Sequence, residues 1–403
     1  MRIVEIEDFF HPDAGYQVNV LSKVLVEHGH EVIIVAAENM DIFPTSLTGF
    51  FGIENIKERD AWYETTFNVK IVRVKARGYY SGRTFYTSEI YSLVDSLHPD
   101  LLFIHGNDTL IGMSYTQRAS KLSFPIILDS HMLSIASHNR LSTVFKKVYS
   151  HFIAPIINRQ RLNVIRVQDD PYVISELGID EELAPYLGFG TDKGLFHPDD
   201  ERKKMLRREL GISQEDTVIL YAGKLDESKG GMLLARAIER SFGTDSLTIV
   251  IAGNTSGEKA DELESAFSSS ENRIIRLPTH KYPELPDLYQ MADLALYPAQ
   301  CSLSFYDVQA SGLPVVVDDS TAVNINRVSS GNGIVFQAGS ASSLHGAIAS
   351  YLSMESDEKN EMKDRSLAYI GERFSYDNVA RRYEEVFRIV VNNFNLKKGI
   401  TNG

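Results

Sequence analysis

Short apolar runs typical of buried strands alternate with helix patterns along most of this chain, and this alternation limits the fold more than any other feature. Residues 2–6 predict a strand, residues 15–28 a helix that Gly29 ends, and EVIIVAAE (31–38) the next strand. Strands joined through a helix lie parallel in one sheet. The same order of strands and helices returns after residue 217. The sequence therefore predicts an α/β protein with two Rossmann-like parallel-sheet domains.

The length of 403 residues also favours two domains over one. A glycine-rich turn segment, YLGFGTDKGLFHPDD (186–200), marks the expected linker. We place the first domain at residues 1–190, the second at 191–375, and a separate C-terminal helix at 376–395. Where two open α/β domains face each other, the cleft between their strand ends is the expected place for a ligand.

Composition excludes several classes of function. The net charge of −13 argues against broad nucleic-acid binding. Cys301 is the single cysteine, so no intrachain disulfide can form and a reducing compartment is expected. The first residues, MRIVEIEDFF, contain acids that a signal peptide lacks, and no run of about 18 apolar residues occurs. These features predict a cytoplasmic protein, with peripheral binding at the inner face of the membrane as an option.

The stretch 217–231, TVILYAGKLDESKGG, predicts a strand, a tight turn and the start of a helix. It places the ammonium groups of Lys224 and Lys229 near the carboxyl end of the strand, where open α/β sheets bind ligands. Two cations beside a helix start are suited to hold a diphosphate. Alternatively, both lysines are solvated and pair with Asp226 and Glu227. This segment alone leaves the two interpretations open.

The first domain offers further candidates. His131 ends PIILDSH (125–131), a buried strand followed by polar residues, which is where such sheets place their chemistry. A structural histidine is the alternative. Gly15, at the turn before the first helix, either lets a ligand approach the backbone or serves only the turn. The Asp169–Asp170 pair suggests a metal site, but its place at a strand exit favours a structural turn or an acceptor-side feature.

Residues 130–168 contain no Asp or Glu, although the chain as a whole is acidic. Apolar residues alternate with basic ones in this stretch. The pattern suits contact with an anionic membrane surface or a lipid-diphosphate acceptor. A long helix with one buried and one solvated face is the alternative, and the simpler one. The basic residues are Arg140, Lys146, Lys147, Arg159, Arg161 and Arg166.

Two other segments of the first domain give weaker patterns. Residues 38–66 lack clear periodicity and predict a long loop with one short helix. RGYYSGRTFY (77–86) is aromatic and basic, which fits either contact with an acceptor or a cap on the sheet.

Several motifs together resemble the retaining family 4 glycosyltransferases with the GT-B fold, part of the glycosyl transferases group 1. ILYAGKLDESKGG is similar to the family's Val-Gly-Arg-Leu…Glu-Lys-Gly element, and GFGTDKGLFHPDD to its linker segment. The remaining second-domain elements follow in order and spacing as IAGNTSGE, LPTHKYPELPDLYQMADLALYP and ASGLPVVVDD. HPDAGYQVNVLSKVLVEHGHEVIIVAAE resembles the segment that faces the donor phosphates. FSYDNVARRYEEVFRIVVNN resembles the terminal helix that packs back onto the first domain.

The resemblance implies that the first domain binds the acceptor and the second binds a nucleotide sugar. Lys229 would hold the donor diphosphate, together with Lys224 in place of the family's usual arginine. Both cations would stabilise charge on the leaving group. In the first domain, Gly15 would bring its amide to the diphosphate and His131 would hydrogen-bond the donor sugar.

Other donor contacts follow from the same resemblance. Asp307 stands where the family has a glutamate for the ribose hydroxyls. The loop that flanks the base would contain Thr279 and His280, and the donor sugar would meet Ser302 and Ser304.

The sequence also departs from the family pattern. Ala299 replaces a second glutamate eight residues before Asp307, the loop from Pro298 to Gly312 is a few residues short, and Asn326 stands near a position where an acid is common.

The expected function is retaining transfer of a hexosyl group from a nucleoside diphosphate sugar to a hydroxyl of a glycan or glycolipid acceptor, for surface polysaccharide or glycoconjugate synthesis. No cofactor and no obligatory metal are expected. The alternatives are a catalytically degenerate GT-B subunit that binds a glycan or partner protein, and a nucleotide-sugar epimerase, which fits the order of elements less well.

Overall fold

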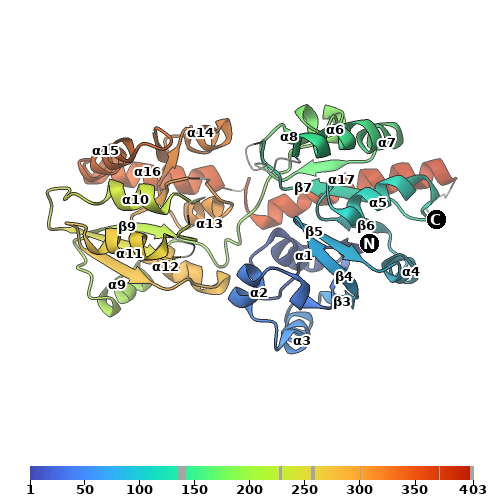
Figure 1. The fold of residues 1–403 in the computed structure, drawn as a ribbon, viewed down its shortest axis with the longest axis horizontal. Helices are drawn as coiled ribbons and strands as arrows, with labels where there is room; N and C mark the ends of the chain where they lie inside the picture. Colours follow the sequence, from blue (N-terminus) through green and yellow to red (C-terminus); the bar gives the residue numbers. More distant parts are fainter. Residues whose placement is uncertain (135–141, 227–228, 256–258, 300, 372, 400–403) are drawn as a thin grey trace. The chain divides into compact units, whose positions relative to one another are not determined.

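The computed structural model describes the chain except residues 135–141, 227–228, 256–258, 300, 372 and 400–403. The chain forms two compact units (Figure 1). The first unit combines Met1–Phe189 with Tyr376–Gly403, and the second is the continuous segment Gly190–Ser375. Each unit contains its own parallel sheet, so the predicted α/β fold class is confirmed.

The sheet of the first unit has the strand order β3-β2-β1-β6-β7-β8, and all neighbours in it are parallel. The chain order reverses between β1 and β6, and open α/β sheets bind ligands beyond the carboxyl ends of the strands at such a point. The strands are β1 Arg2–Ile6, β2 Glu31–Ala37, β3 Lys70–Val74, β6 Leu101–Ile104, β7 Ile126–Ser130 and β8 Val164–Arg166.

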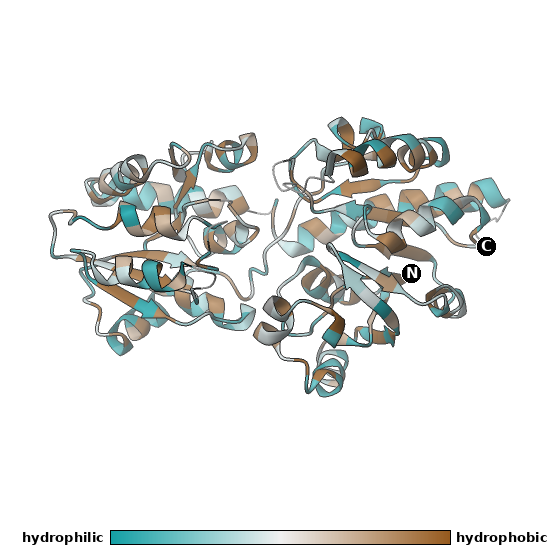
Figure 2. Cartoon of the chain, in the orientation of Figure 1, coloured by the Kyte–Doolittle hydropathy of each residue, from teal (hydrophilic) through white to brown (hydrophobic). Residues whose placement is uncertain are grey.

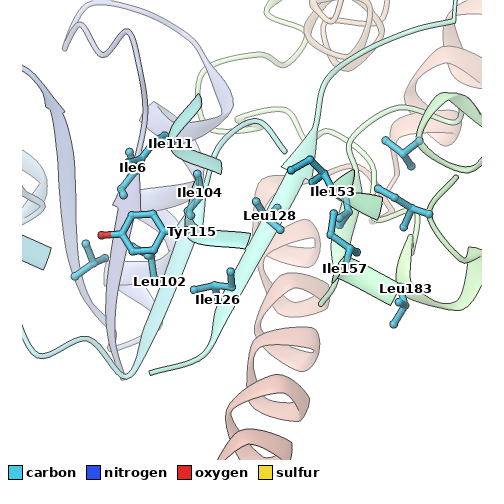
Figure 3. Packing of buried hydrophobic residues seen from close by; sticks show 14 of the residues in the cluster. Ile6, Leu102, Ile104, Ile111, Tyr115, Ile126, Leu128, Ile153, Ile157 and Leu183 are labelled. Carbon is cyan, nitrogen blue, oxygen red and sulfur yellow. The ribbon is translucent and has the colours of Figure 1, made fainter. Parts of the chain in front are cut away.

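Alternation along the strands of the first unit divides their side chains between two buried faces. On one face, Ile6 and Leu128 belong to a core that includes residues of α5 and α7 (Figure 3). On the other face, Phe103 lies against Tyr383 and Phe387 of α17, with ring centroids 5.9 and 5.4 Å apart. The helices are α1 Gln17–Glu27, α2 Thr45–Phe51, α3 Ile56–Phe67, α4 Glu89–Ser96, α5 Leu110–Arg118, α6 Ser142–Phe152, α7 Ala154–Gln160, α8 Tyr172–Ser175 and α17 Tyr376–Lys398.

The second unit repeats this plan with the strand order β11-β10-β9-β12-β13-β14, again with parallel neighbours. Its reversal point lies between β9 and β12. The strands are mostly apolar (Figure 2), with Arg276 in β11 and Asp318 at the end of β13 as charged exceptions. They are β9 Thr217–Ala222, β10 Leu247–Ala252, β11 Ile274–Leu277, β12 Leu294–Tyr297, β13 Val315–Asp318 and β14 Gly333–Phe336.

Helices of the second unit supply the rest of its core. Leu234 of α10, Leu263 of α11 and Ile348 of α15 pack with Ile219 and Ile251 of the sheet. The helices are α9 Asp200–Glu209, α10 Gly231–Ala237, α11 Ala260–Ser268, α12 Leu285–Met291, α13 Ser304–Ala310, α14 Ala322–Val328, α15 Ala341–Leu352 and α16 Ser356–Ile370.

The structure corrects the prediction of a long loop at residues 38–66. A short 3-10 helix at Met40–Ile42, then α2 and α3, occupy this segment. The helical period of α3 is weak in the sequence because Asp60 is one of its buried residues. Asp60 accepts two hydrogen bonds from Arg73 of β3, at 2.9 and 2.7 Å. On the buried face of α3, an ion pair to the sheet thus stands where a regular amphipathic helix would have an apolar side chain.

The structure also shows the secondary structure of two other segments whose sequence patterns left alternatives open. RGYYSGRTFY forms most of a hairpin of β4 Ala76–Tyr80 and β5 Arg83–Tyr86, with Gly82 at the turn at φ +81°. The stretch 130–168 forms the two helices α6 and α7 in place of one long helix, and its Arg140 lies outside the described residues. Within the described part of the chain, no helix has both the length and the apolar content needed to cross a bilayer.

Candidate functional site

Two lysines lie at the carboxyl end of β9, beside the reversal point of the second sheet. Lys224 is exposed, and Lys229 is half-buried two residues before α10 begins. Burial lowers the pKa of Lys229, against the opposing effect of Asp226, and the nearby charge of Lys224 lowers it further. The backbone N–H of Lys229 donates to Asp226 Oδ1 at 3.1 Å, which fixes the turn. The predicted partner Glu227 lies outside the described residues. A partly desolvated cation next to a second one attracts an anionic ligand.

Glycines bring the loop after β9 close to its neighbours. Gly230 has φ +73°, and a Cβ there would lie 3.1 Å from Pro298 Cβ and 3.3 Å from Ala299 Cβ. A Cβ on Gly253 would lie 1.9 Å from the carbonyl oxygen of Gly223. A side chain would therefore be strained at Gly230 and is excluded at Gly253, and the loops after β9, β10 and β12 lie close together beside the two lysines.

The loop that connects β12 to α13 is held by hydrogen bonds between hydroxyl groups. Ser302 Oγ lies 2.7 Å from Ser304 Oγ, which lies 3.0 Å from the hydroxyl of Tyr297. Arg327 of α14 donates to the carbonyl of Cys301 at 2.8 Å, and this hydrogen bond ties the loop to α14. The buried Cys301 thiol is close enough to Lys229 to affect its pKa. Ser302 directly follows Cys301 in this loop, and a common site of Ser302, Ser304 and Lys229 stays a prediction.

Asp307 is buried on α13. Its Oδ1 accepts a hydrogen bond from Thr191 Oγ1 at 2.7 Å. Burial raises the pKa of Asp307 to about 8, although the Thr191 hydrogen bond opposes the shift. The sequence analysis did not identify Thr191, because a threonine in a linker carries no signal until the linker is seen to return to α13.

Thr279 and His280 follow β11, two strands away from β9. Thr279 Oγ1 accepts from the backbone N–H of Asn254 at 2.8 Å, and this ties the loop after β11 to the loop after β10. His280 donates from Nδ1 to the carbonyl of Pro278 at 2.8 Å. Both residues therefore lie at the same edge of the sheet as the lysines, further along it.

The first unit contributes a separate group at its own reversal point. Gly15 lies between β1 and α1, one residue before the N-cap of the helix, and His131 directly follows β7. His131 Nε2 lies 3.2 Å from Asp129 Oδ2, and the same oxygen lies 2.9 Å from His105 Nδ1. The side chain of His131 is 37% exposed, whereas Asp129 is fully buried. Sequence reasoning selected His131 but missed His105, since β6 and β7 have to be neighbours for the contact to form.

Acidic groups surround this histidine. Burial raises the pKa of Glu7, against the opposing charge of His105. Burial likewise raises the pKa of Asp8 to about 7, although its Oδ2 accepts the backbone N–H of Thr84 at 2.9 Å. Both acids directly follow β1, in the segment from which the sequence analysis selected only Gly15. Perturbed carboxyl groups beside a histidine at a switch point are typical of a functional site.

Metal binding was considered for two groups of residues. Asp170 accepts from Ser134 Oγ at 2.6 Å and from the Tyr172 backbone N–H at 2.8 Å, so its carboxylate fixes the start of α8. His105, Asp129 and His131 offer ligand atoms within 4.8 Å of one another. The hydrogen bonds between these three side chains account for that spacing, and the expectation of no obligatory metal stays a prediction.

Comparison with known proteins finds a family that the second unit resembles. Residues 202–367 match the family described as Glycosyl transferases group 1. A lipopolysaccharide 1,2-N-acetylglucosaminetransferase of Salmonella typhimurium is 24% identical over 203 residues, 45% of this chain and 50% of that protein. A D-inositol 3-phosphate glycosyltransferase of Corynebacterium aurimucosum is 23% identical over 319 residues, 75% of each. The alignments thus span between half and three quarters of these curated relatives.

Solved structures resemble the whole chain. The Anabaena protein Alr3699/HepE, determined in complex with UDP and glucose, has a TM-score of 0.71 at 16% identity, covering 96% of this chain and 99% of that one. This likeness shows the fold, which is that of GT-B proteins with two Rossmann-like units. Residues 202–367 match the group 1 glycosyl transferases, and the resemblance seen in the sequence is confirmed at that level.

Proposed function

We propose that this chain is a retaining glycosyltransferase that moves a hexosyl group from a nucleoside diphosphate sugar to a hydroxyl of a glycan or glycolipid. The observation that carries the proposal is the pair Lys224 and Lys229 at the end of β9, inside the family-matched residues 202–367. The sugar-transferring names of the relatives, and the UDP and glucose bound by the Anabaena protein, support a nucleotide-sugar donor.

The chemistry needs a site that stabilises a leaving diphosphate. The bond from the anomeric carbon to the diphosphate breaks, a bond to the acceptor oxygen forms on the same face, and the acceptor proton passes to the leaving group. Negative charge grows on the diphosphate as the sugar gains oxocarbenium character. Lys229 stabilises that charge more strongly than a fully hydrated ammonium would, because it is partly desolvated, and Lys224 adds to the effect.

The remaining residues would hold the donor along the sheet edge. Asp307 would accept the ribose hydroxyls, and Ser302 and Ser304 would contact the sugar next to Lys229. Thr279 and His280, on the loop after β11, would flank the base. The roles of Gly15 and His131 in the first unit, an amide for the diphosphate and a ring nitrogen for the sugar, stay predictions from the family resemblance.

Thermal unfolding with UDP, GDP, ADP and their common sugars, with and without chelator, tests the proposal. A nucleotide at ~100 times its Kd adds about 2.7 kcal/mol to the free energy of unfolding, which appears as a rise in melting temperature. We expect one nucleotide to stabilise the protein, chelator to have no effect, and Lys229→Ala to remove the rise. Lys204→Ala is the matched control, since Lys204 is an exposed α9 lysine paired with Glu201.

A catalytically degenerate subunit is the second candidate, and Ala299 favours it. The structure places Ala299 against Gly230 beside Lys229, where the family carries a carboxylate. If no nucleotide or nucleotide sugar stabilises the wild type, a transferase is excluded and glycan binding becomes the function to test.

An acceptor at a membrane surface is supported by the face of α6 and α7. Val144, Val148 and Phe152 follow one another at helical spacing and are 57, 50 and 68% exposed. Two exposed basic residues belong to the same helices, Lys147 in α6 and Arg159 in α7. An amphipathic helix of this kind binds anionic bilayers through its apolar side chains and its positive charge. Two other basic residues of the stretch are engaged elsewhere, since Lys146 pairs with Glu176 and Arg161 with Glu182.

Co-sedimentation with vesicles containing anionic lipid tests the membrane contact. We expect Val148→Ser/Phe152→Ser to abolish binding, and each of Lys147→Gln and Arg159→Gln to weaken it about fivefold. Val335→Ser, at an exposed apolar residue of β14, is the control and should bind like the wild type. Equal binding by the wild type and the α6 variants would exclude this surface.

A further inference from the structure

Three neighbouring strands of the first unit place ionisable side chains on one buried face. Glu5 lies in β1, Asp129 lies in β7, and His105 directly follows β6. All three are buried, and alternation along the strands directs them to the side that α1 and α17 cover. Buried charges persist in proteins where they are paired and hydrogen-bonded.

Asp129 is the centre of this group and its carboxylate is fully engaged. Oδ1 accepts the backbone N–H of Gly106 at 2.8 Å. Oδ2 lies 2.9 Å from His105 Nδ1 and 3.2 Å from His131 Nε2. A carboxylate oxygen has two acceptor positions, so both ring N–H groups can donate to Oδ2 at once. The Gly106 contact fixes the plane of the carboxylate and hence the direction of both rings.

His105 holds Asp129 in its charged form. Burial disfavours a charged His105 ring, but Asp129 and Glu5 outweigh it and raise the pKa of His105 well above its usual range. His105 Nε2 lies 3.5 Å from Glu5 Oε2, which also accepts from Ser22 Oγ at 2.7 Å. Burial works against ionisation of Asp129, yet the charge of His105 and the hydrogen bonds from both rings lower its pKa. A carboxylate held ionised is a strong and permanent acceptor for the second ring.

The geometry points to Asp129 as a positioning residue that keeps His131 in the form with a proton on Nε2 and an unprotonated Nδ1. That form leaves Nδ1 as a hydrogen-bond acceptor on a side chain that is 37% exposed, so that a sugar hydroxyl can donate to it. Within the described residues, no hydrogen bond to His131 Nδ1 occurs. The role toward a sugar rests on the proposed function, whereas the orientation of the ring does not.

Ring-nitrogen NMR spectra of the full chain test the orientation without any substrate. The His131 signals are assigned by their loss in His131→Gln. We expect a proton on Nε2 that exchanges slowly and resonates downfield because Asp129 accepts it, and we expect Asp129→Asn to remove this signal. Asp216→Asn is the matched control, since Asp216 is a buried carboxyl group of the second unit that accepts from Thr248. It should leave the His131 signals unchanged.

Other results would overturn the inference. A proton on His131 Nδ1 in the wild type excludes it, and this holds even if Asp129→Asn fails to fold. Persistence of the downfield His131 Nε2 proton signal in Asp129→Asn excludes the inference as well. Movement of the His105 and His131 signals on adding chelator would mean that these side chains bind a metal and that Asp129 does not act as the hydrogen-bond acceptor.

Kinetics separate this inference from the proposed function. In an active enzyme, Asp129→Asn should lower kcat by about tenfold to a hundredfold, because a misdirected ring no longer steadies the sugar. The nucleotide-induced rise in melting temperature should stay, since the nucleotide residues lie in the other unit. A wild type that shows the Nε2 signal but transfers no sugar would exclude the function and leave the positioning role intact.

Discussion

At the scale of single residues, Asp307 gives the protein a pH dependence with a definite sign. Burial raises its pKa to about 8, so the folded chain holds a proton there between about pH 4 and pH 8 that the unfolded chain has released. The free energy of unfolding therefore falls with rising pH across this window, by up to about 1.4 kcal/mol per pH unit, and the effect levels off above pH 8. Asp307→Asn, which mimics the neutral form, should remove this slope in urea unfolding measured from pH 5 to 9.

The control for this prediction is an exposed carboxyl group in the same unit. Asp245→Asn should follow the wild-type curve at every pH, since Asp245 is exposed between α10 and β10. Parallel curves for the wild type and Asp307→Asn would show that Asp307 is ionised in the folded protein, contrary to the prediction.

At the scale of elements, α17 is tied to the first unit by aromatic packing and by polar contacts. Phe387 is fully buried against Phe103, and Tyr383 accepts a hydrogen bond from Gln17 of α1 at 2.6 Å. We expect Phe387→Ala to destabilise the first unit by about 3 to 5 kcal/mol, through lost burial and the cavity left behind. Ile389→Ala, two residues on and 53% exposed, should change stability by about 0.5 kcal/mol or less. Chemical denaturation of both variants measures the difference.

The sequence predicts regular elements well and unusual ones poorly. The second unit's strands follow from short apolar runs, and the lysine turn follows from the glycine that ends the run of β9, which are local signals. The helix α3 was missed because Asp60 lies on its buried side, and that side chain is acceptable only where Arg73 faces it. For the same reason, His105 and Thr191 could not be selected: each gains its partner through strand order or through the return of the linker, and neither is visible in the local sequence.

At the scale of the whole molecule, the second unit is an insertion into the first. The chain enters and leaves it at adjacent points, since Thr191 donates its backbone N–H to Phe374 at 2.8 Å. Just outside, Phe189 and Tyr376 of the first unit lie with ring centroids 5.6 Å apart. Insertions with neighbouring ends are compatible with independent folding.

This arrangement predicts an asymmetry between fragments. Residues 190–375 contain a complete sheet and core and should fold alone, with a cooperative thermal transition and dispersed NMR signals. Residues 1–189 lack α17, so Phe103 and its neighbours lose their cover, and this fragment should fold only when a peptide of residues 376–398 is added. The same peptide carrying Phe387→Ala is the matched control and should restore less structure. Independent folding of 1–189 would show that α17 is an accessory helix, whereas failure of 190–375 would mean that the second unit depends on contacts with the rest of the chain.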